Sequence, residues 1–258
     1  MDLGIKGKNV LVTGASQGIG RAIALEFAKE NCNVTVIARR QNELEKVVEE
    51  MGGIRNGHSY YSIDLMPYGN PTKAVHDLTT DRLYEIIVHN VGGTLNIKDC
   101  LSPVEDWNNV WRNNVGIAIE MNHLLIPQMQ KKKWGRVIHI SSISAENLRG
   151  SGPYGAAKAY LNAYTKVLGK QVAKDGVVVS ALAPGSIYAS GGPWDPENPI
   201  NKKDPEAFQR KQSDFLRHHH AIGRLGTAEE IAPFAVFMAS KYVTFAPTSI
   251  IPIDGGTE

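Results

Sequence analysis

The stretch "KNVLVTGASQGIGRAIALEFA" at positions 8–28 contains a short β-rich run, a glycine-rich turn and the start of a helical pattern. Gly14, Gly18 and Gly20 form the pattern G-x-x-x-G-x-G directly after the run. Glycine allows a tight turn and a close approach of the backbone to a ligand, and the helix behind the turn presents free N–H groups. This succession is typical of an α/β fold that holds a phosphate-bearing ligand.

Runs rich in Val and Ile alternate with longer helical patterns along the whole chain. The runs lack a clean apolar–polar alternation, which indicates strands buried on both faces of a parallel sheet. The expected strands cover 8–13, 33–38, 58–63, 84–90, 136–141, 177–183 and 249–254, and the expected helices cover roughly 19–30, 40–51, 71–80, 105–132, 153–174 and 227–240. We therefore predict an α/β fold in which residues 1–258 form a single doubly wound Rossmann-type domain, with about seven parallel strands flanked by helices on both faces.

The overall composition is typical of a soluble globular chain. Hydrophobic residues make up 42% and charged residues 21% of the 258 positions, and the formal net charge is +2. This balance favours neither a nucleic-acid partner nor a membrane surface, and no apolar run reaches the ~18 residues that cross a bilayer. No secretory pattern opens the chain, and Cys32 and Cys100 stand in no metal or redox spacing. We expect a cytoplasmic protein with reduced thiols.

One segment, at about 185–222, interrupts the alternation. It is rich in Pro, Gly, Asn and Asp, with a helical pattern near 205–217. It leaves the carboxyl end of the sixth expected strand, the edge at which open α/β sheets bind ligands, and long insertions of this kind are usually lids or binding loops. We expect it to cover a substrate, and Trp194 to contact that substrate. The histidines at 218–220 point in different directions on a helix, so we expect no bound metal.

The glycine turn has no following Lys-Ser/Thr pair, so it is not a P-loop and favours a dinucleotide instead. The second expected strand ends in "VIARRQ", with Arg39 and Arg40 where NAD-binding sheets often carry a carboxylate for the ribose 2′-hydroxyl. An arginine pair suits a 2′-phosphate, so NADP is favoured over NAD. The alternative is that both arginines are solvated at the start of the next helix, which fits Arg40 better. Asp64 is placed to accept from an adenine amino group, although a turn-capping aspartate has the same signature.

The stretch "PYGAAKAYLNAY" at 153–164 places Tyr154 and Lys158 four residues apart, on one face of a helix. A phenol has a pKa near ~10, too high for a base at neutral pH, and a neighbouring ammonium or a cationic oxidised nicotinamide favours the phenolate. Such pairs are common on helices by accident. With Ser142 at a strand end upstream and the glycine turn in place, a proton-transfer pair is the better interpretation.

In order, these motifs resemble those of the short-chain dehydrogenase/reductase family, in its short single-domain branch, and within it the 3-oxoacyl reductases. The likeness runs from "TGASQGIG" to the terminal "DGG", through "HNVGG", "EDWNNVWRNNVG", "IHISSISA", "YGAAK", "APGSI" and "GRLGTAEEIA". Two departures are visible beside Asn90, where His89 and Val91 replace the usual Asn and Ala. Ala189, followed by Ser190, stands where the family often has a threonine that contacts the nicotinamide carboxamide. The loop from Ser142 to Tyr154 is also one residue shorter than in many relatives.

The resemblance implies a catalytic role for four residues. Tyr154 donates a proton to a carbonyl oxygen while hydride arrives from the nicotinamide, and Ser142 holds the same oxygen. Lys158 holds the nicotinamide ribose, and Asn114 anchors a water beside Lys158. The expected cofactor contacts are Gly14, Ser16, Gln17, Gly18, Ile19, Gly20, Arg39, Arg40, Asp64, Leu65, Asn90, Gly92, Tyr154, Lys158, Pro184, Gly185 and Ile187. The expected substrate contacts are Ser142, Tyr154 and Trp194, with further wall from 93–95, 144–148 and 186–194.

We therefore expect an NADP(H)-dependent oxidoreductase that interconverts a ketone and a secondary alcohol, with a 3-oxoacyl thioester or another small ketone or polyol as substrate. The resemblance also implies a homo-oligomer, dimer or tetramer, packed through 105–132 and 153–174. One alternative is a catalytically silent nucleotide-binding sensor or scaffold on the same fold, against which the four catalytic residues argue. A Rossmann-like methyltransferase fits the glycine turn but leaves the Tyr–Lys pair without a role.

Overall fold

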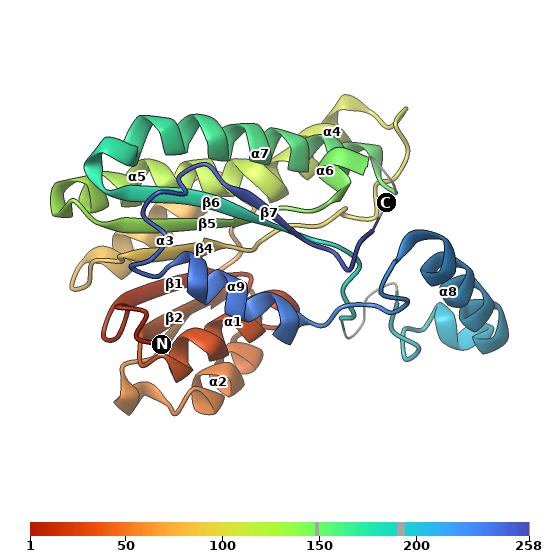
Figure 1. The fold of residues 1–258 in the computed structure, drawn as a ribbon, viewed down its shortest axis with the longest axis horizontal. Helices are drawn as coiled ribbons and strands as arrows, with labels where there is room; N and C mark the ends of the chain where they lie inside the picture. Colours follow the sequence, from red (N-terminus) through yellow and green to blue (C-terminus); the bar gives the residue numbers. More distant parts are fainter. Residues whose placement is uncertain (148–149, 190–193, 258) are drawn as a thin grey trace.

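The computed structural model describes residues 1–147, 150–189 and 194–257. Within them, seven strands form one parallel sheet in the order β3-β2-β1-β4-β5-β6-β7 (Figure 1). The strands are β1 Asn9–Thr13, β2 Asn33–Ala38, β3 Ser59–Ser62, β4 Ile86–His89, β5 Gly135–Ile140, β6 Val177–Pro184 and β7 Ile250–Ile253. Every expected strand is present, with ends that differ by at most two residues.

Helices cover both faces of the sheet, which confirms the doubly wound arrangement. Figure 1 shows α1, α2 and α9 on one face and α3, α4, α5 and α7 on the other. Their bounds are α1 Gly18–Lys29, α2 Gln41–Glu50, α3 Asn70–Thr79, α4 Val104–Trp111, α5 Ile117–Lys132, α7 Gly152–Val172 and α9 Ala228–Met238. Alternate residues of a strand face opposite ways, so Val10 and Val12 join the core under α1 and α9, whereas Leu11 joins the core under α3 and α5.

The helical stretch expected over 105–132 is present, but it is not one regular α-helix, because a π-helical turn, η2 Arg112–Gly116, lies between α4 and α5. A π-helical turn inserts one extra residue into a helix and has no clear sequence signature. Arg112 fixes the turn: its guanidinium pairs with Glu120 at 2.8 Å and donates to the carbonyl oxygen of Met66 at 3.0 Å. The turn is buried throughout, and it carries Asn113 and Asn114.

The chain reverses its direction of travel across the sheet between β1 and β4. It runs from β1 outward to β3 and then crosses back to β4 on the other side of β1. Side chains that follow β1 and β4 diverge at such a switch point, which leaves a crevice at the carboxyl ends of the strands. This crevice is where we look for a ligand site.

The excursion after β6 contains α8 Pro205–His219, which lies apart from the sheet (Figure 1). Its base is held by two isolated β-bridges, one between Ile187 and Gly226 and one between His220 and Thr257. A short helix, α6 Ser144–Asn147, was not expected from the sequence. Among the described residues, no helix is both long and apolar enough to span a bilayer.

Candidate active site

A cavity of about 750 Å³, named here the carboxyl-edge cavity, opens at the carboxyl ends of the strands. Its size is typical of a ligand or cofactor site. It collects side chains that follow β1 to β6, far apart in the sequence. All expected cofactor residues except Gly20 line it, as do Ser142, Tyr154 and Lys158, whereas Asn114 and Trp194 do not.

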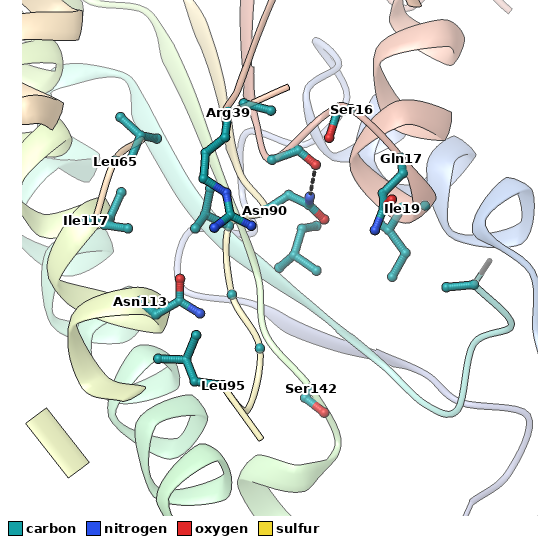
Figure 2. A pocket seen from close by; sticks show the side chains of 18 of the residues that line it. Ser16, Gln17, Ile19, Arg39, Leu65, Asn90, Leu95, Asn113, Ile117 and Ser142 are labelled. Atoms are coloured by element: carbon teal, nitrogen blue, oxygen red, sulfur yellow. Dashed lines mark hydrogen bonds between the residues drawn. The ribbon is translucent and has the colours of Figure 1, made fainter. Parts of the chain in front are cut away.

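Asn90 joins the glycine turn to the end of β4. Its side-chain amide donates to the carbonyl oxygen of Gly14 at 3.0 Å, and its backbone N–H donates to the hydroxyl of Thr13 at 3.1 Å (Figure 2). A Cβ on Gly20 would lie 2.4 Å from the Asn90 amide nitrogen, so only glycine allows this packing. Gly18 has a positive φ of 57° and open space where a Cβ would project. The turn is thus a backbone cradle at the N-terminus of α1, suited to a pyrophosphate.

Two arginines follow β2, and they lie differently. Arg40 donates to Gln17 at 2.5 Å and to Ser16 at 3.2 Å, so this exposed side chain braces the glycine turn. Arg39 extends from the end of β2 into the carboxyl-edge cavity (Figure 2). No carboxylate follows β2 in this cavity wall, among the residues described. The arrangement suits a phosphate on the adenosine ribose.

Asp64 has the properties of both interpretations that its sequence left open. Its Oδ1 accepts the backbone N–H of Met66 at 3.0 Å, which is a turn cap. The side chain is nevertheless exposed and lines the cavity, so its other oxygen is free to accept from a ligand. Leu65 and Ile117 form an apolar wall beside it (Figure 2).

Tyr154 and Lys158 lie on the inner face of α7, which is bound tightly to β5. Lys158 Nζ donates to the carbonyl oxygen of Ile140 at 2.7 Å, and Ser141 donates to Asn162 one turn further along at 2.6 Å. At the start of α7, Ser151 accepts the backbone N–H of Tyr154 at 3.2 Å. These contacts hold both catalytic candidates at the wall of the carboxyl-edge cavity, next to Ser142 at the end of β5.

Burial is the dominant influence on both titratable groups. It raises the pKa of the Tyr154 phenol, and a hydrogen bond with Ser142 lowers that pKa by less. Burial lowers the pKa of Lys158 to about 7. The expected lowering of the Tyr154 pKa by the Lys158 ammonium is therefore not the leading effect, since Lys158 Nζ lies 5.5 Å from the ring centroid and donates to a backbone carbonyl. A phenol that keeps its proton is suited to donating it to a carbonyl oxygen.

Asn114 is a structural anchor in this arrangement. Its side-chain nitrogen donates to the carbonyl oxygens of Gly93 and Val110, both at 2.8 Å, and its oxygen accepts the N–H of Gly93 at 3.0 Å. These bonds hold the loop after β4 against η2. Both side-chain N–H groups of Asn114 are engaged in these bonds, and the water that we expected Asn114 to anchor beside Lys158 stays a prediction.

The expected substrate wall is only partly assembled around the cavity. Gly93, Leu95, Ile187 and Ala189 line it, whereas residues 144–147 of α6 do not. Leu148 and residues 190–193, Ser190 included, lie outside the described residues. Trp194 packs against Phe215 of α8, with ring centroids 4.5 Å apart, so its expected contact with substrate stays a prediction.

The structure also reveals a lining residue that the sequence analysis missed. Asn113 is 7% exposed, lines the carboxyl-edge cavity between Ile117 and Leu95 and points into it (Figure 2). Within the described chain its side chain has no hydrogen-bond partner, which fits a group that awaits a ligand. It lies within η2, a turn that the sequence did not predict, and its place beside Asn114 was the signal available in the sequence.

No group of three or more metal-ligating side chains exists in the described ranges 1–147, 150–189 and 194–257. The histidine tract at the end of α8 stacks with an aromatic side chain instead. The rings of His219 and His220 lie 5.3 Å and 5.2 Å from that of Phe215.

Comparison with known proteins agrees with this geometry. The short chain dehydrogenase family model matches residues 8–192. The chain is 30% identical to the 3-oxoacyl-(acyl-carrier-protein) reductase FabG of Pseudomonas aeruginosa, with 98% of each chain covered. It superposes on L-sorbose reductase from Gluconobacter frateurii with a TM-score of 0.91, 29% identity and coverage of 100% of this chain and 98% of that one. A 3-oxoacyl reductase from Agrobacterium tumefaciens gives 0.87 and 27%, with coverage of 98% and 95%. The chain belongs to the short-chain dehydrogenase family.

Proposed function

We propose that the protein is an NADP(H)-dependent oxidoreductase that interconverts a ketone and a secondary alcohol, with Tyr154 as the general acid and base. One observation carries the proposal: Ser142, Tyr154 and Lys158 line the same cavity as the glycine turn and Arg39. A nucleotide-binding scaffold without chemistry needs the turn but has no use for the buried Tyr–Lys pair beside it.

Ser142, Tyr154 and Lys158, which line one part of the cavity, have separate roles in the proposed reaction. NADPH, when bound, supplies the hydride. Ser142 donates a hydrogen bond to the carbonyl oxygen and holds it near the phenol. Tyr154 gives its proton to that oxygen in reduction and takes it back in oxidation. Lys158, with a pKa of about 7, lies beside this site and would donate a hydrogen bond to the ribose of the cofactor.

NADP is the cofactor that the residues after β2 favour. Arg39 projects into the cavity and Arg40 fixes Ser16 and Gln17, so the 2′-phosphate would meet a guanidinium and a hydroxyl. The similar L-sorbose reductase was solved with NADPH, and the similar 3-oxoacyl reductase from A. tumefaciens with NADP. Both observations support the same choice for this chain.

For the substrate, we propose a small uncharged ketone, either a sugar-like polyol or the 3-oxoacyl group of a thioester. Leu95, Ile187 and Ala189 present apolar surface near Ser142. Apart from Lys158, no charged side chain of the described wall lies at this end of the cavity, so a free carboxylate on the substrate has no obvious partner. L-sorbose and 3-oxoacyl groups are the named substrates of the similar proteins.

The test is a panel of ketones and alcohols, assayed by NADPH absorbance with NADPH and NADH in parallel. The proposal expects turnover with at least one ketone and a preference for NADPH. A protein that binds NADPH but turns over no member of a broad panel would instead support the silent sensor.

We further propose that residues 1–258 act as one domain in which α8 and its flanks cover the substrate. We also propose that the protein forms a homo-oligomer, dimer or tetramer, through the helices at 105–132 (α4 to α5) and at 153–174 (α7). Tyr160 and Val167 on α7 are 49% and 65% exposed, so this helix presents two apolar side chains that a partner subunit could cover. Light scattering of the wild type and of a Val167→Glu variant tests this: the variant should have the lower mass.

A further inference from the structure

Arg136, near the start of β5, is a buried cation without a counter-ion. Its side chain is 2% exposed. Nη1 donates to the carbonyl oxygen of Gly135 at 2.9 Å and Nη2 to that of Ser240 at 3.2 Å, while Nε has no partner within the described chain. No carboxylate in the described ranges forms an ion pair with it, and burial lowers its pKa to about 10.

The lysines around Arg136 differ from it because each of them is paired with a carboxylate. Each of three neighbouring lysines has a carboxylate within ion-pair distance: Lys8 with Glu85 at 3.1 Å, Lys133 with Asp175 at 2.6 Å and Lys241 with Asp2 at 2.6 Å. Arginine is rarely buried without such a partner. The Ser240 carbonyl, just beyond the C-terminus of α9, offsets part of the charge, but a carbonyl does not neutralise a guanidinium. A buried donor without an acceptor is the kind of group that a bound ion can satisfy.

A cavity of about 210 Å³ adjoins this arginine, and we name it the amino-edge cavity because it lies where β5 and β6 begin. Its wall includes Arg136, Trp134, Lys133, Lys241 and Thr244. The guanidinium carbon of Arg136 lies 4.6 Å from the Trp134 ring centroid, which orients the planar group. The wall therefore combines a preoriented guanidinium, a hydroxyl and two ammonium groups around a space for a small ligand. The two ammonium groups also pair with Asp175 and Asp2, so an anion would share them with these carboxylates.

We propose that the amino-edge cavity binds a small oxyanion, either phosphate or the phosphoryl end of a larger molecule. The negative charge of this oxyanion would neutralise the guanidinium of Arg136. Oxyanions accept several charge-assisted hydrogen bonds at once, and guanidinium with ammonium groups is the donor set that suits them. The site is separate from the carboxyl-edge cavity, since the two lie at opposite ends of the strands. It does not depend on the proposed reaction.

Calorimetric titration with inorganic phosphate tests the proposal, at constant ionic strength set with chloride. The titration is run with and without saturating NADP, because phosphate can also enter the cofactor site beside Arg39. We expect one phosphate per chain with NADP present and a Kd of about 1–10 mM. Phosphate at about five times Kd should raise Tm by about 3 °C. Acetate in place of phosphate distinguishes a phosphoryl site from a general oxyanion site.

Two variants make the assignment specific. Arg136→Met should fold, because it removes a desolvated charge, and should lose the phosphate-dependent Tm shift. Lys241→Ala changes an exposed side chain and should weaken phosphate binding about tenfold without disturbing the fold. Arg210→Met, on the exposed face of α8, is the matched control and should bind phosphate as the wild type does.

Three results would overturn the proposal. The first is a wild type that binds no phosphate once NADP is saturating. The second is an Arg136→Met variant that binds phosphate with wild-type affinity. The third, which decides the matter if Arg136→Met does not fold, is a Lys241→Ala variant with unchanged affinity.

Discussion

Lys158 and Arg136 are buried cations at opposite ends of β5, and the described chain offers neither of them a carboxylate. Lys158 donates to the Ile140 carbonyl at the carboxyl end of the strand, and Arg136 donates to the Gly135 and Ser240 carbonyls near the amino end. Burial lowers both pKa values, to about 7 and about 10. Each lines a cavity, but the two cavities differ in what surrounds the cation.

The carboxyl-edge cavity places Ser142 and Tyr154 beside its lysine, and the amino-edge cavity places no tyrosine beside its arginine. A cation that can lose its proton near pH 7, next to hydroxyl groups, suits proton transfer. A permanently charged guanidinium beside ammonium groups suits binding alone. The difference teaches that an unpaired buried cation marks a ligand site, and that its neighbours decide between chemistry and binding.

The largest expected effect comes from removing the phenol oxygen at the catalytic end. Tyr154→Phe should lower kcat/KM by about 10²–10⁴-fold, because the proton donor is lost, while NADPH affinity stays the same. Steady-state kinetics and NADPH fluorescence measure the two quantities. Tyr160→Phe, on the exposed side of the same helix, is the control. Wild-type turnover in Tyr154→Phe would mean that Tyr154 is not the proton donor and that the carboxyl-edge cavity is not the catalytic one of the two.

Lys158→Met should separate activity from stability. Turnover should fall by about 100-fold or more, whereas the free energy of unfolding should rise. The folded-state pKa of about 7 lies below the usual lysine value, so wild-type stability increases as pH rises from about 7 to about 10.4. A shift of about 3.5 pKa units corresponds to about 5 kcal/mol, and the variant should lack this pH dependence.

Denaturant unfolding at several pH values measures this effect. Lys166→Met, an exposed position on α7, should leave both activity and pH dependence unaltered. A destabilised Lys158→Met would mean that the ammonium is compensated by a group other than the Ile140 carbonyl.

Two buried neutral histidines, His89 on β4 and His139 on β5, should make the free energy of unfolding fall in acid. Burial lowers the pKa of His89 to about 4, so protonating its ring in the folded protein is unfavourable. Its Nε2 forms a hydrogen bond with Asn122 Oδ1 at 2.8 Å. Because the unfolded chain binds this proton below about 6.5, stability should fall by about 3 kcal/mol as pH drops from about 6.5 to about 4. The pKa of His139 is lowered in the same direction.

The check is the unfolding midpoint measured between pH 4 and 7. His89→Asn should flatten part of the slope, and His218→Asn, an exposed histidine, should not. An equal slope in wild type and His89→Asn would show that His89 is not the group that titrates.

The smallest effect concerns cofactor choice. Arg39→Ala should raise the KM for NADPH about tenfold and leave the KM for NADH nearly unchanged, because only NADPH carries the phosphate that pairs with the guanidinium. Kinetics with both cofactors measure the ratio. Equal losses for the two cofactors would mean that Arg39 supports the fold of the cavity rather than reads the 2′-phosphate.

The strands and most of the catalytic end could be predicted from the sequence because their signals are local. Runs of β-branched residues, or of tyrosines in the case of β3, identified β1 to β7, and Tyr154 and Lys158 are visible at helical spacing. The interruption at Arg112–Gly116 could not be predicted, since an inserted π-helical turn does not change which residue types are apolar. Asn113, which lines the cavity, lies within that turn.

The burial of Arg136 could not be predicted from the sequence either. One arginine at the start of an apolar run resembles the exposed end of a strand. Its burial depends on Trp134, on the end of α9 and on the loop that carries Lys241, which come together only in the folded chain. Asn114 was found by resemblance, but its bonds to Gly93 and Val110 required the structure.

The central claim is that one cavity presents a hydride donor and a proton donor to the same carbonyl group. Incubation with NADPH deuterated at the transferable position of the nicotinamide, and with a ketone found in the screen, tests it directly by mass spectrometry of the product. The account predicts one deuterium on the carbinol carbon with the wild type and labelled product formed about 10²–10⁴-fold more slowly with Tyr154→Phe, although both bind NADPH. A labelled product in equal yield from both proteins, or an unlabelled alcohol from the wild type, would contradict it.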